Sequence, residues 1–451
     1  MKLIRKAAAL LASAALAFSA FSVPLGAYAL TPEQAAELGE ALNDGTFTYE
    51  LVDGSYTITK CDVTASVSKV PELRNGYAIT AIADGAFLGC TNIASLTIPE
   101  SVKSIGVQAF AGCTSLSKVH LPSRLTEIPE ACFMTCISLE TVELSDNVTM
   151  IGENAFYGCT NLKEFKIPDK LELIGDLAFG DCASISSFDT EGSEHYLFRD
   201  GILYSRDLAT IYRASTELSG DLYINENVTK IANGAFSMCA KLDNVFLPGS
   251  VHQLTDDVFG YCTNLRSVHF SEGLTDIGYL AFQFCLNLDS VDFPTTLRNI
   301  DDGAFYNCTA LERIILPDQL DKIGVGSFLN CTALKNVLLP QGISSIGEHA
   351  FGFTDSTDGT FNKAEGFELS VFNGSEGAAY AKRSGISYKN VNNSLKKVLF
   401  ITIALALVAA AGVFAAVLMS RGRKSASSAV KEADKLAAEE EEEKNYKKIL
   451  D

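Results

Sequence analysis

A short phrase recurs through this chain at a fixed period of 23 residues. It consists of a small residue, a phenylalanine, two variable positions and, in ten of the eleven copies, a cysteine. A period of this size predicts a solenoid, in which each coil buries its apolar residues only by stacking on its neighbours. Such a fold favours a long binding surface. The phenylalanines are Phe87, Phe110, Phe133, Phe156, Phe179, Phe236, Phe259, Phe282, Phe305, Phe328 and Phe351, and only the step from Phe179 to Phe236 exceeds one period.

The residues between two phenylalanines predict one parallel β-strand per coil. In one copy Val119 and Leu121 lie two positions apart, as one face of a strand requires, and Pro122, which lacks an amide donor, ends the strand. Leu125 and Ile128 then point inward again. Several copies place glycine at the turn that follows, namely Gly106, Gly152, Gly175, Gly278, Gly324 and Gly347.

These motifs resemble a known family. The segment from Ile151-Gly152 through Ala155-Phe156-Tyr157-Gly158-Cys159 to Leu162 is similar to the repeat of the BspA-like bacterial leucine-rich repeat proteins, and the resemblance covers about residues 47–388. It implies a β-rich leucine-rich repeat solenoid closed by caps: a hairpin at residues 49–59, and a helix and strand at 374–386. It also implies a surface-exposed protein linked to adhesion and protein binding, without shared catalytic residues.

Both ends of the chain carry apolar segments of different kinds. A basic start is followed by an apolar run and the small-x-small triplet Ala27-Tyr28-Ala29, which predicts a cleaved secretory signal at residues 1–29. Residues 398–419 contain no charged side chain and are long enough to span a bilayer as one helix. Arg421 and Arg423 follow this segment, which predicts extracellular repeats and a cytoplasmic tail.

The expected organisation follows from these segments. A signal peptide at 1–29 precedes an N-terminal helix and capping hairpin at 30–75. The leucine-rich repeat solenoid occupies 76–353, with a β insertion at about 189–225. A C-terminal cap at 354–389, a linker at 390–397, a transmembrane helix at 398–419 and a charged tail at 420–451 follow. Within the insertion, residues 195–205 predict a hairpin on the two-residue turn Asp200-Gly201, and residues 210–213 a third strand.

Ten of the twelve cysteines occupy one position of the repeat. Such residues are expected to stack about 4.8 Å apart. Their parallel Cβ directions do not favour disulfides, so we expect buried thiols that pack like small apolar groups, with scattered disulfides or a metal site as alternatives. The ladder comprises Cys90, Cys113, Cys136, Cys159, Cys182, Cys239, Cys262, Cys285, Cys308 and Cys331, while Cys61 and Cys132 lie outside it.

The sequence predicts neither catalysis nor a cofactor. Its five histidines show no tight metal-binding spacing, and no nucleophile elbow, phosphate-binding loop or dinucleotide fingerprint is present. We therefore expect no enzyme activity, no catalytic residues, no metal and no cofactor. The formal net charge of −19 argues against nucleic acid as a partner.

One column of the repeat suggests where a partner binds. The residue after the inward-pointing strand valine or its equivalent faces away from the core. Before the insertion this column is polar: Thr97, His120, Glu143, Lys166 and Asp189. After it the column reads Phe246, His269, Asp292, Ile315 and Leu338, and Arg313 is expected at its rim. An apolar patch with a polar rim is typical of a contact surface.

These observations favour a membrane-anchored extracellular protein that binds a protein ligand, in adhesion to host or neighbouring-cell proteins. The alternative is an envelope sensor or scaffold whose charged tail contacts a cytoplasmic partner. The ligand's identity does not follow from the sequence. Contact of the apolar column with the C-terminal cap or with a second copy of the chain is the other interpretation of that surface.

Overall fold

A computed structural model describes residues 43–391. The expected signal peptide, the N-terminal helix before residue 43, the transmembrane helix at 398–419 and the charged tail lie outside the described residues. Within residues 43–391, no helix has both the length and the apolar character needed to cross a bilayer.

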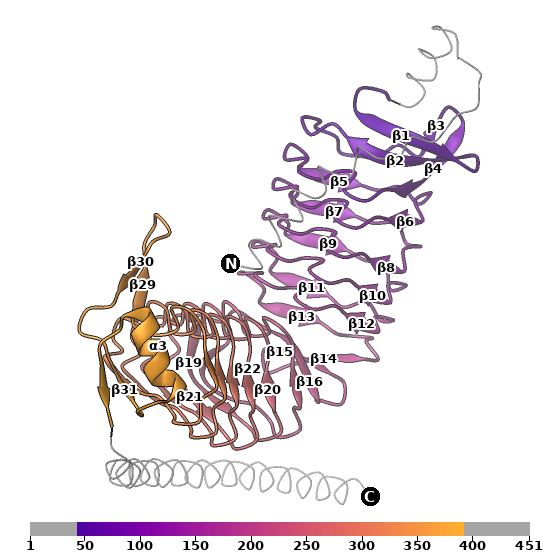
Figure 1. The fold of residues 1–451 in the computed structure, drawn as a ribbon. Coiled ribbons are helices and arrows are strands. Elements are labelled where there is room, and N and C mark those ends of the chain that lie inside the picture. Colours follow the sequence, from indigo (N-terminus) through magenta and orange to yellow (C-terminus); the bar gives the residue numbers. More distant parts are fainter. Residues whose placement is uncertain (1–42, 392–451) are drawn as a thin grey trace, which may run out of the picture. The chain divides into compact units, whose positions relative to one another are not determined.

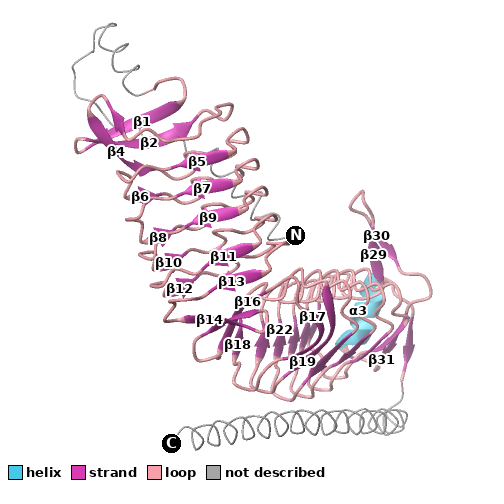
Figure 2. Cartoon of the chain, turned by 180° about the vertical axis from the view of Figure 1, so that it is seen from behind, coloured by secondary structure: helices cyan, strands magenta, loops and turns pink. Residues whose placement is uncertain are grey.

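The repeats form coils of a β-solenoid (Figure 1). Each coil contributes a longer strand to one side and a two-residue strand to the other, so that two ladders run along the solenoid (Figure 2). The expectation of one strand per coil is therefore wrong in this detail. In the second strand an outward-facing residue precedes a buried isoleucine or leucine, as in Glu127–Ile128, and this pair aligns in parallel with its counterpart, Met150–Ile151.

The longer strands form what we call the strand face. The coils before the insertion, the first stack, supply β5 (Ser95–Thr97), β7 (Lys118–His120), β9 (Thr141–Glu143), β11 (Glu164–Lys166) and β13 (Ser187–Asp189). The coils after it, the second stack, supply β17 (Ser219–Tyr223), β19 (Lys241–Leu247), β21 (Ser267–Phe270), β23 (Ser290–Asp292), β25 (Arg313–Ile315) and β27 (Asn336–Leu338). The register keeps equivalent residues side by side, for example Phe246 beside His269.

The two-residue strands form the return ladder on the opposite side. They are β6 (Ser104–Ile105), β8 (Glu127–Ile128), β10 (Met150–Ile151), β12 (Leu173–Ile174), β18 (Lys230–Ile231), β20 (Gln253–Leu254), β22 (Asp276–Ile277), β24 (Asn299–Ile300), β26 (Lys322–Ile323) and β28 (Ser345–Ile346).

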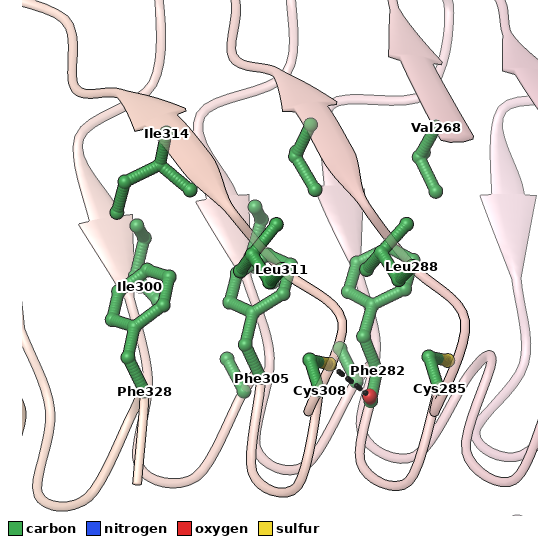
Figure 3. Close-up of a cluster of buried hydrophobic side chains, with 14 of the residues drawn as sticks. Val268, Phe282, Cys285, Leu288, Ile300, Phe305, Cys308, Leu311, Ile314 and Phe328 are labelled. Atoms are coloured by element: carbon green, nitrogen blue, oxygen red, sulfur yellow. Dashed lines mark hydrogen bonds between the residues drawn. The ribbon is translucent and has the colours of Figure 1, made fainter. Parts of the chain in front are cut away.

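The repeat phenylalanines form the centre of the core. Phe282, Phe305 and Phe328 stack nearly parallel, with ring centroids 5.1 and 5.0 Å apart, and have almost no exposed surface (Figure 3). The 23-residue period places each ring above the preceding one within a stack, so a ring such as Phe305 buries both faces against its neighbours.

Glycine at the isoleucine–glycine turn is required by the close approach of two coils. A Cβ atom at Gly152 would lie 2.6 Å from the backbone nitrogen of Glu130 in the preceding coil. Real Cβ atoms do not approach backbone that closely, so only glycine allows the coils to stack at this corner. The same approach occurs at Gly106, Gly175, Gly278, Gly324 and Gly347.

Caps cover both ends of the coils. The N-terminal cap is the expected hairpin, β1 (Phe47–Val52) with β2 (Ser55–Cys61), and β4 (Tyr77–Ile82) joins it to the return ladder, with β3 (Leu73–Arg74) at its edge. The C-terminal cap contains β31 (Glu368–Val371), the helix α3 (Glu376–Ser384) and β32 (Tyr388–Asn390). A further hairpin, β29 (Phe353–Asp355) with β30 (Phe361–Lys363), precedes this cap. The hairpin and the helix lie where the family resemblance implied them, whereas the closing strand begins at Tyr388, beyond the expected range of 374–386.

The insertion joins the two stacks. The expected hairpin is confirmed as β14 (Tyr196–Arg199) and β15 (Ile202–Ser205), in which Arg199 pairs with Ile202 across a two-residue turn. The expected third strand is β16 (Thr210–Ala214), which pairs with β15 and, in parallel, with β18 of the second stack. The amide of Thr216 donates to the carbonyl of Ile185, so the chain also holds the last coil of the first stack.

Arg213 lies buried at this joint, where an ordinary coil would carry apolar side chains. Only 2% of its surface is exposed. Its guanidinium donates to the carbonyls of Gly234 and Cys182, one in each stack. Arg213 Nε and Asp181 Oδ1 have no hydrogen-bond partner among the described residues. A cavity of about 10 Å³ beside Arg213 has room for one water molecule.

Carboxylates surround this arginine. Asp181 accepts a hydrogen bond from the Tyr157 hydroxyl. The half-buried Asp257 accepts from Gln283 at 2.7 Å and from Ser237 at 3.0 Å. Burial raises the pKa of Asp257 to about 7, and the charge of Asp181 adds to this effect. The group of Arg213, Asp181 and Asp257 is therefore electrically balanced only while Asp257 holds its proton.

We expect Asp257→Asn to stabilise the protein above pH 7. The native pKa lies above the unfolded value near 3.8, so the favourable contribution of Asp257 is fully present below about pH 4 and is lost as the pH rises through about 7. The asparagine oxygen accepts from Gln283, and its NH2 group donates to the Ser237 hydroxyl in a reversed bond, without a charge. The gain should be about 1–3 kcal/mol in the free energy of unfolding at pH 8, and near zero at pH 4, measured by urea denaturation. The exposed Asp289→Asn is the control, and equal effects of the two variants would contradict this assignment.

Candidate protein-binding face

The strand face differs between the two stacks. In the first stack the column residues Thr97, His120, Glu143, Lys166 and Asp189 are exposed and polar. Ion pairs link several of them: Glu143 lies 2.6 Å from Lys118 and 3.0 Å from His120, and Lys166 lies 3.0 Å from Asp146. Exposed ion pairs of this kind contribute little to stability. With exposed, polar side chains throughout, this part of the face is an ordinary solvated surface.

In the second stack the same column begins with stacked rings. The ring of Phe246 lies 4.4 Å from that of Tyr223 and 4.7 Å from that of His269, and all three planes are nearly parallel. His269 also lies 3.5 Å from the carboxylate of Asp292 on the next coil. The three rings and the carboxylate thus form a continuous row on adjacent strands.

The row continues with aliphatic side chains. Ile315 is paired in register with Asp292, and Leu338 occupies the same position one coil further on. Both are half-buried, so part of each side chain reaches solvent. Leu338 is followed by Ser370 of the C-terminal cap, which ends the apolar part of the column. Arg313 is exposed beside them, as expected for a rim residue.

A second column of polar groups runs alongside. Asn244 donates to Asp221 at 2.7 Å, and Ser267 donates to Asn244 at the same distance. The hydroxyl of Ser267 lies 3.0 Å from Nε2 of His269, which connects the two columns. These bonds fix the side chains before any partner arrives, which lowers the entropic cost of binding.

Sequence reasoning missed Tyr223. The range 189–225 was assigned to the insertion, whereas β17 already pairs in parallel with β19 and places Tyr223 beside Phe246. With 39% of its surface exposed, Tyr223 is the most exposed aromatic of the row and extends the apolar column by one coil. The alternation of Leu222 and Ile224 around it was the signal that could have identified this strand.

The structure places the ten ladder cysteines inside the coils. From Cys113 onward each thiol donates to the backbone carbonyl of the coil before it, usually that of the repeat phenylalanine; the Cys308–Phe282 bond is 3.1 Å long (Figure 3). Burial raises the pKa of these thiols, to about 12 for Cys113, Cys182 and Cys239. No group of three metal-ligating side chains occurs within residues 43–391.

Comparison with known proteins agrees with this architecture. The family model described as "BspA type Leucine rich repeat region (6 copies)" matches residues 80–203, 212–311 and 256–378. Among the curated proteins, none matches the chain.

Solved structures show the same fold. A leucine-rich cell surface protein of Faecalibacterium prausnitzii A2-165 is 28% identical, with a TM-score of 0.51, over 68% of this chain and 94% of that one. The pneumococcal vaccine antigen PcpA is 18% identical, with a TM-score of 0.52, over 77% of this chain and 96% of that one. The repeat, the coil and the family match together establish that this chain belongs to the BspA-type leucine-rich repeat family.

Proposed function

We propose that this protein is a membrane-anchored extracellular module that binds a protein ligand through the strand face of its second stack. The observation that carries the proposal is the change of one column from polar to apolar between the stacks. Tyr223, Phe246, Ile315 and Leu338 present partly exposed apolar surface at positions that are Thr97, His120, Glu143 and Lys166 in the first stack. Apolar surface within a polar rim favours protein binding.

The extracellular location rests on the predicted signal at 1–29 and the predicted span at 398–419. It is supported by the likeness to a bacterial cell surface protein of which this chain covers 94%. Adhesion is the role we propose for such a surface. The charge of the chain, −19, is consistent with a protein partner and not with nucleic acid.

A photo-crosslinking residue tests the face in living cells. With p-benzoylphenylalanine in place of Leu338 or Ile315 in the full-length protein, we expect irradiation to yield a crosslinked protein adduct. The same residue in place of Lys166 or Asp189, which occupy the same column of the first stack, should yield none. Equal crosslinking from both stacks would show that the apolar column is not the contact face.

The partner identified in this way then allows an affinity measurement. Changing Ile315 and Leu338 together to Ser should weaken binding more than tenfold, which corresponds to about 1.4 kcal/mol. The control is the double change Lys166→Ser and Asp189→Ser, which should leave affinity unaltered. Because both apolar side chains are only half-buried, the melting temperature of the first variant should remain close to that of the wild type. Marked unfolding would instead assign these side chains to the core.

A further inference from the structure

The first ladder thiol, Cys90, shares its hydrogen-bond acceptor with a second thiol. Cys61 is the last residue of β2 in the capping hairpin, and Cys90 is the ladder cysteine of the first coil. The Sγ atoms of Cys61 and Cys90 lie 3.6 and 3.8 Å from the same acceptor, the carbonyl oxygen of Asp62. Both residues are buried, with 1% and 0% of their surface exposed.

The geometry follows from the way the cap meets the coil. In most later coils the thiol donates to the carbonyl of the repeat phenylalanine in the preceding coil, as Cys113 does to Phe87 at 3.2 Å. Below Cys90 there is no earlier repeat, so the carbonyl of Asp62 takes that place and brings Cys61 with it. The amide of Cys61 donates to the carbonyl of Ala86, four residues before Cys90, which fixes the hairpin against this coil.

We propose that Cys61 and Cys90 form a disulfide that fastens the N-terminal capping hairpin to the first coil. The ladder cysteines from Cys113 onward remain thiols, because each has a backbone carbonyl of its own as acceptor and shares it with no second thiol among the described residues. Extracellular proteins lie in an oxidising environment. Whether the two thiols are oxidised in the organism therefore rests on the extracellular location given under the proposed function. The capacity of the two sulfurs to join does not depend on that location.

The chemistry is thiol–disulfide exchange with a low-molecular-weight disulfide or an exchange enzyme. The thiolate of Cys90 attacks one sulfur of the oxidant, forms a mixed disulfide and releases one thiolate. The thiolate of Cys61 then attacks the sulfur of Cys90 and releases the second. Two protein thiols and one disulfide thus give one protein disulfide and two small thiols. The neighbouring Cys61 side chain lowers the pKa of Cys90, which favours Cys90 as the attacking group, and burial raises the pKa of Cys113 and the thiols beyond it.

The disulfide would act on the cap and not on the coils. The hairpin covers the open end of the ladder, which would otherwise expose unpaired strand edges. A bond between residues 61 and 90 restricts the conformations that the chain can adopt when the hairpin detaches. Detachment then gains less conformational entropy and is less favourable. We therefore expect oxidation to slow the opening of β1 and β2 and to leave the second stack unchanged.

The test uses the purified full-length protein and oxidised glutathione. After incubation the protein is denatured, labelled with N-ethylmaleimide, digested and analysed by mass spectrometry. The expected product is a peptide pair linked through Cys61 and Cys90, with Cys113 and the later ladder cysteines labelled as free thiols. Full labelling of Cys61 and Cys90, glutathione held on Cys90 alone, or a bond between Cys90 and Cys113 would each overturn the proposal.

Hydrogen exchange adds a structural measurement. Dithiothreitol should accelerate exchange of the amides in β1 and β2 at least tenfold in the oxidised protein and should not affect β19 to β25. Cys61→Ser should abolish the response, whereas the control Cys132→Ser, at a buried cysteine outside the ladder, should retain it. An unchanged rate in the oxidised wild type would overturn the proposal even if the variants failed to fold. Trapping with N-ethylmaleimide in intact cells separately reports whether the repeats reach an oxidising compartment.

Discussion

Gly324→Ala is expected to destabilise the second stack severely, whereas Gly342→Ala should be nearly neutral. A Cβ atom at Gly324 would lie 2.4 Å from the backbone nitrogen of Asp302 and 2.5 Å from the carbonyl carbon of Asp301, both in the preceding coil. A Cβ atom at Gly342 would meet only the carbonyl oxygen of Asp318, at 3.9 Å, which is ordinary contact. The two glycines lie in the same part of the second stack, so they form a matched pair.

The cost at Gly324 cannot be relieved by a rotamer change, because the opposing atoms belong to the backbone. The two coils must separate locally, which breaks the hydrogen bond from the Gly324 amide to the carbonyl of Ile300. Overpacking of this kind typically costs about 1–3 kcal/mol, and contact with backbone places Gly324→Ala at about 3 kcal/mol or more. Gly342→Ala should change stability by less than about 1 kcal/mol, with a gain possible from the stiffer unfolded chain.

Urea denaturation of both variants measures the difference. A similar free energy of unfolding for Gly324→Ala and Gly342→Ala would show that the coils can separate at the glycine corner without loss. It would also remove the explanation of why so many copies of the repeat carry glycine at this position.

The solenoid could be predicted because its determinants are periodic. Each phenylalanine, cysteine and inward aliphatic residue recurs at the spacing of one coil, so the same inference is repeated along the chain and errors at one copy do not accumulate. The return ladder escaped prediction because two-residue strands such as Ser104–Ile105 show too little alternation to be distinguished from a turn. Only the stacking of coils creates their hydrogen bonds.

The candidate face was predictable in part for the same reason. The repeat register predicts the positions of Phe246, Ile315 and Leu338. It does not predict the position of Tyr223, because the insertion interrupts the period before that residue. The stacking of Tyr223, Phe246 and His269 depends on side-chain orientation, which the sequence pattern does not determine. The contact of Cys61 with Cys90 likewise depends on how the cap meets the first coil.

The joint at Arg213 was not predictable from local sequence. Arg213 belongs to Thr210–Ala214, a short strand with no unusual neighbour, and an arginine in such a strand is ordinarily exposed. It is buried because the insertion replaces a coil that would have carried a phenylalanine. The arginine fills the gap and bonds to one carbonyl on each side, Cys182 and Gly234.

We expect Arg213→Ala to divide the unfolding of the protein into two transitions. The buried side chains form two clusters that meet at the insertion, one ending at Leu203 and the other beginning at Ile202. Removing the guanidinium leaves the carbonyls of Gly234 and Cys182 without this donor and Asp181 without its nearby positive charge. Leaving a buried polar group without its partner typically costs about 1–3 kcal/mol, and two carbonyls lose a donor here.

This loss is confined to the interface between neighbouring units of a solenoid. The units of a repeat protein unfold together only while the interface between them stabilises both. Weakening one interface therefore uncouples the units on its two sides. Hydrogen exchange in increasing urea should therefore show the first stack and the second stack opening at one urea concentration in the wild type and at two in Arg213→Ala. Arg206→Ala, at an exposed arginine of the same insertion, is the control and should unfold in one transition. A single transition for Arg213→Ala, with unchanged stability, would mean that the other bonds of the insertion, among them the β16–β18 pairing and those of Ala214 and Thr216, hold the two stacks together without the arginine.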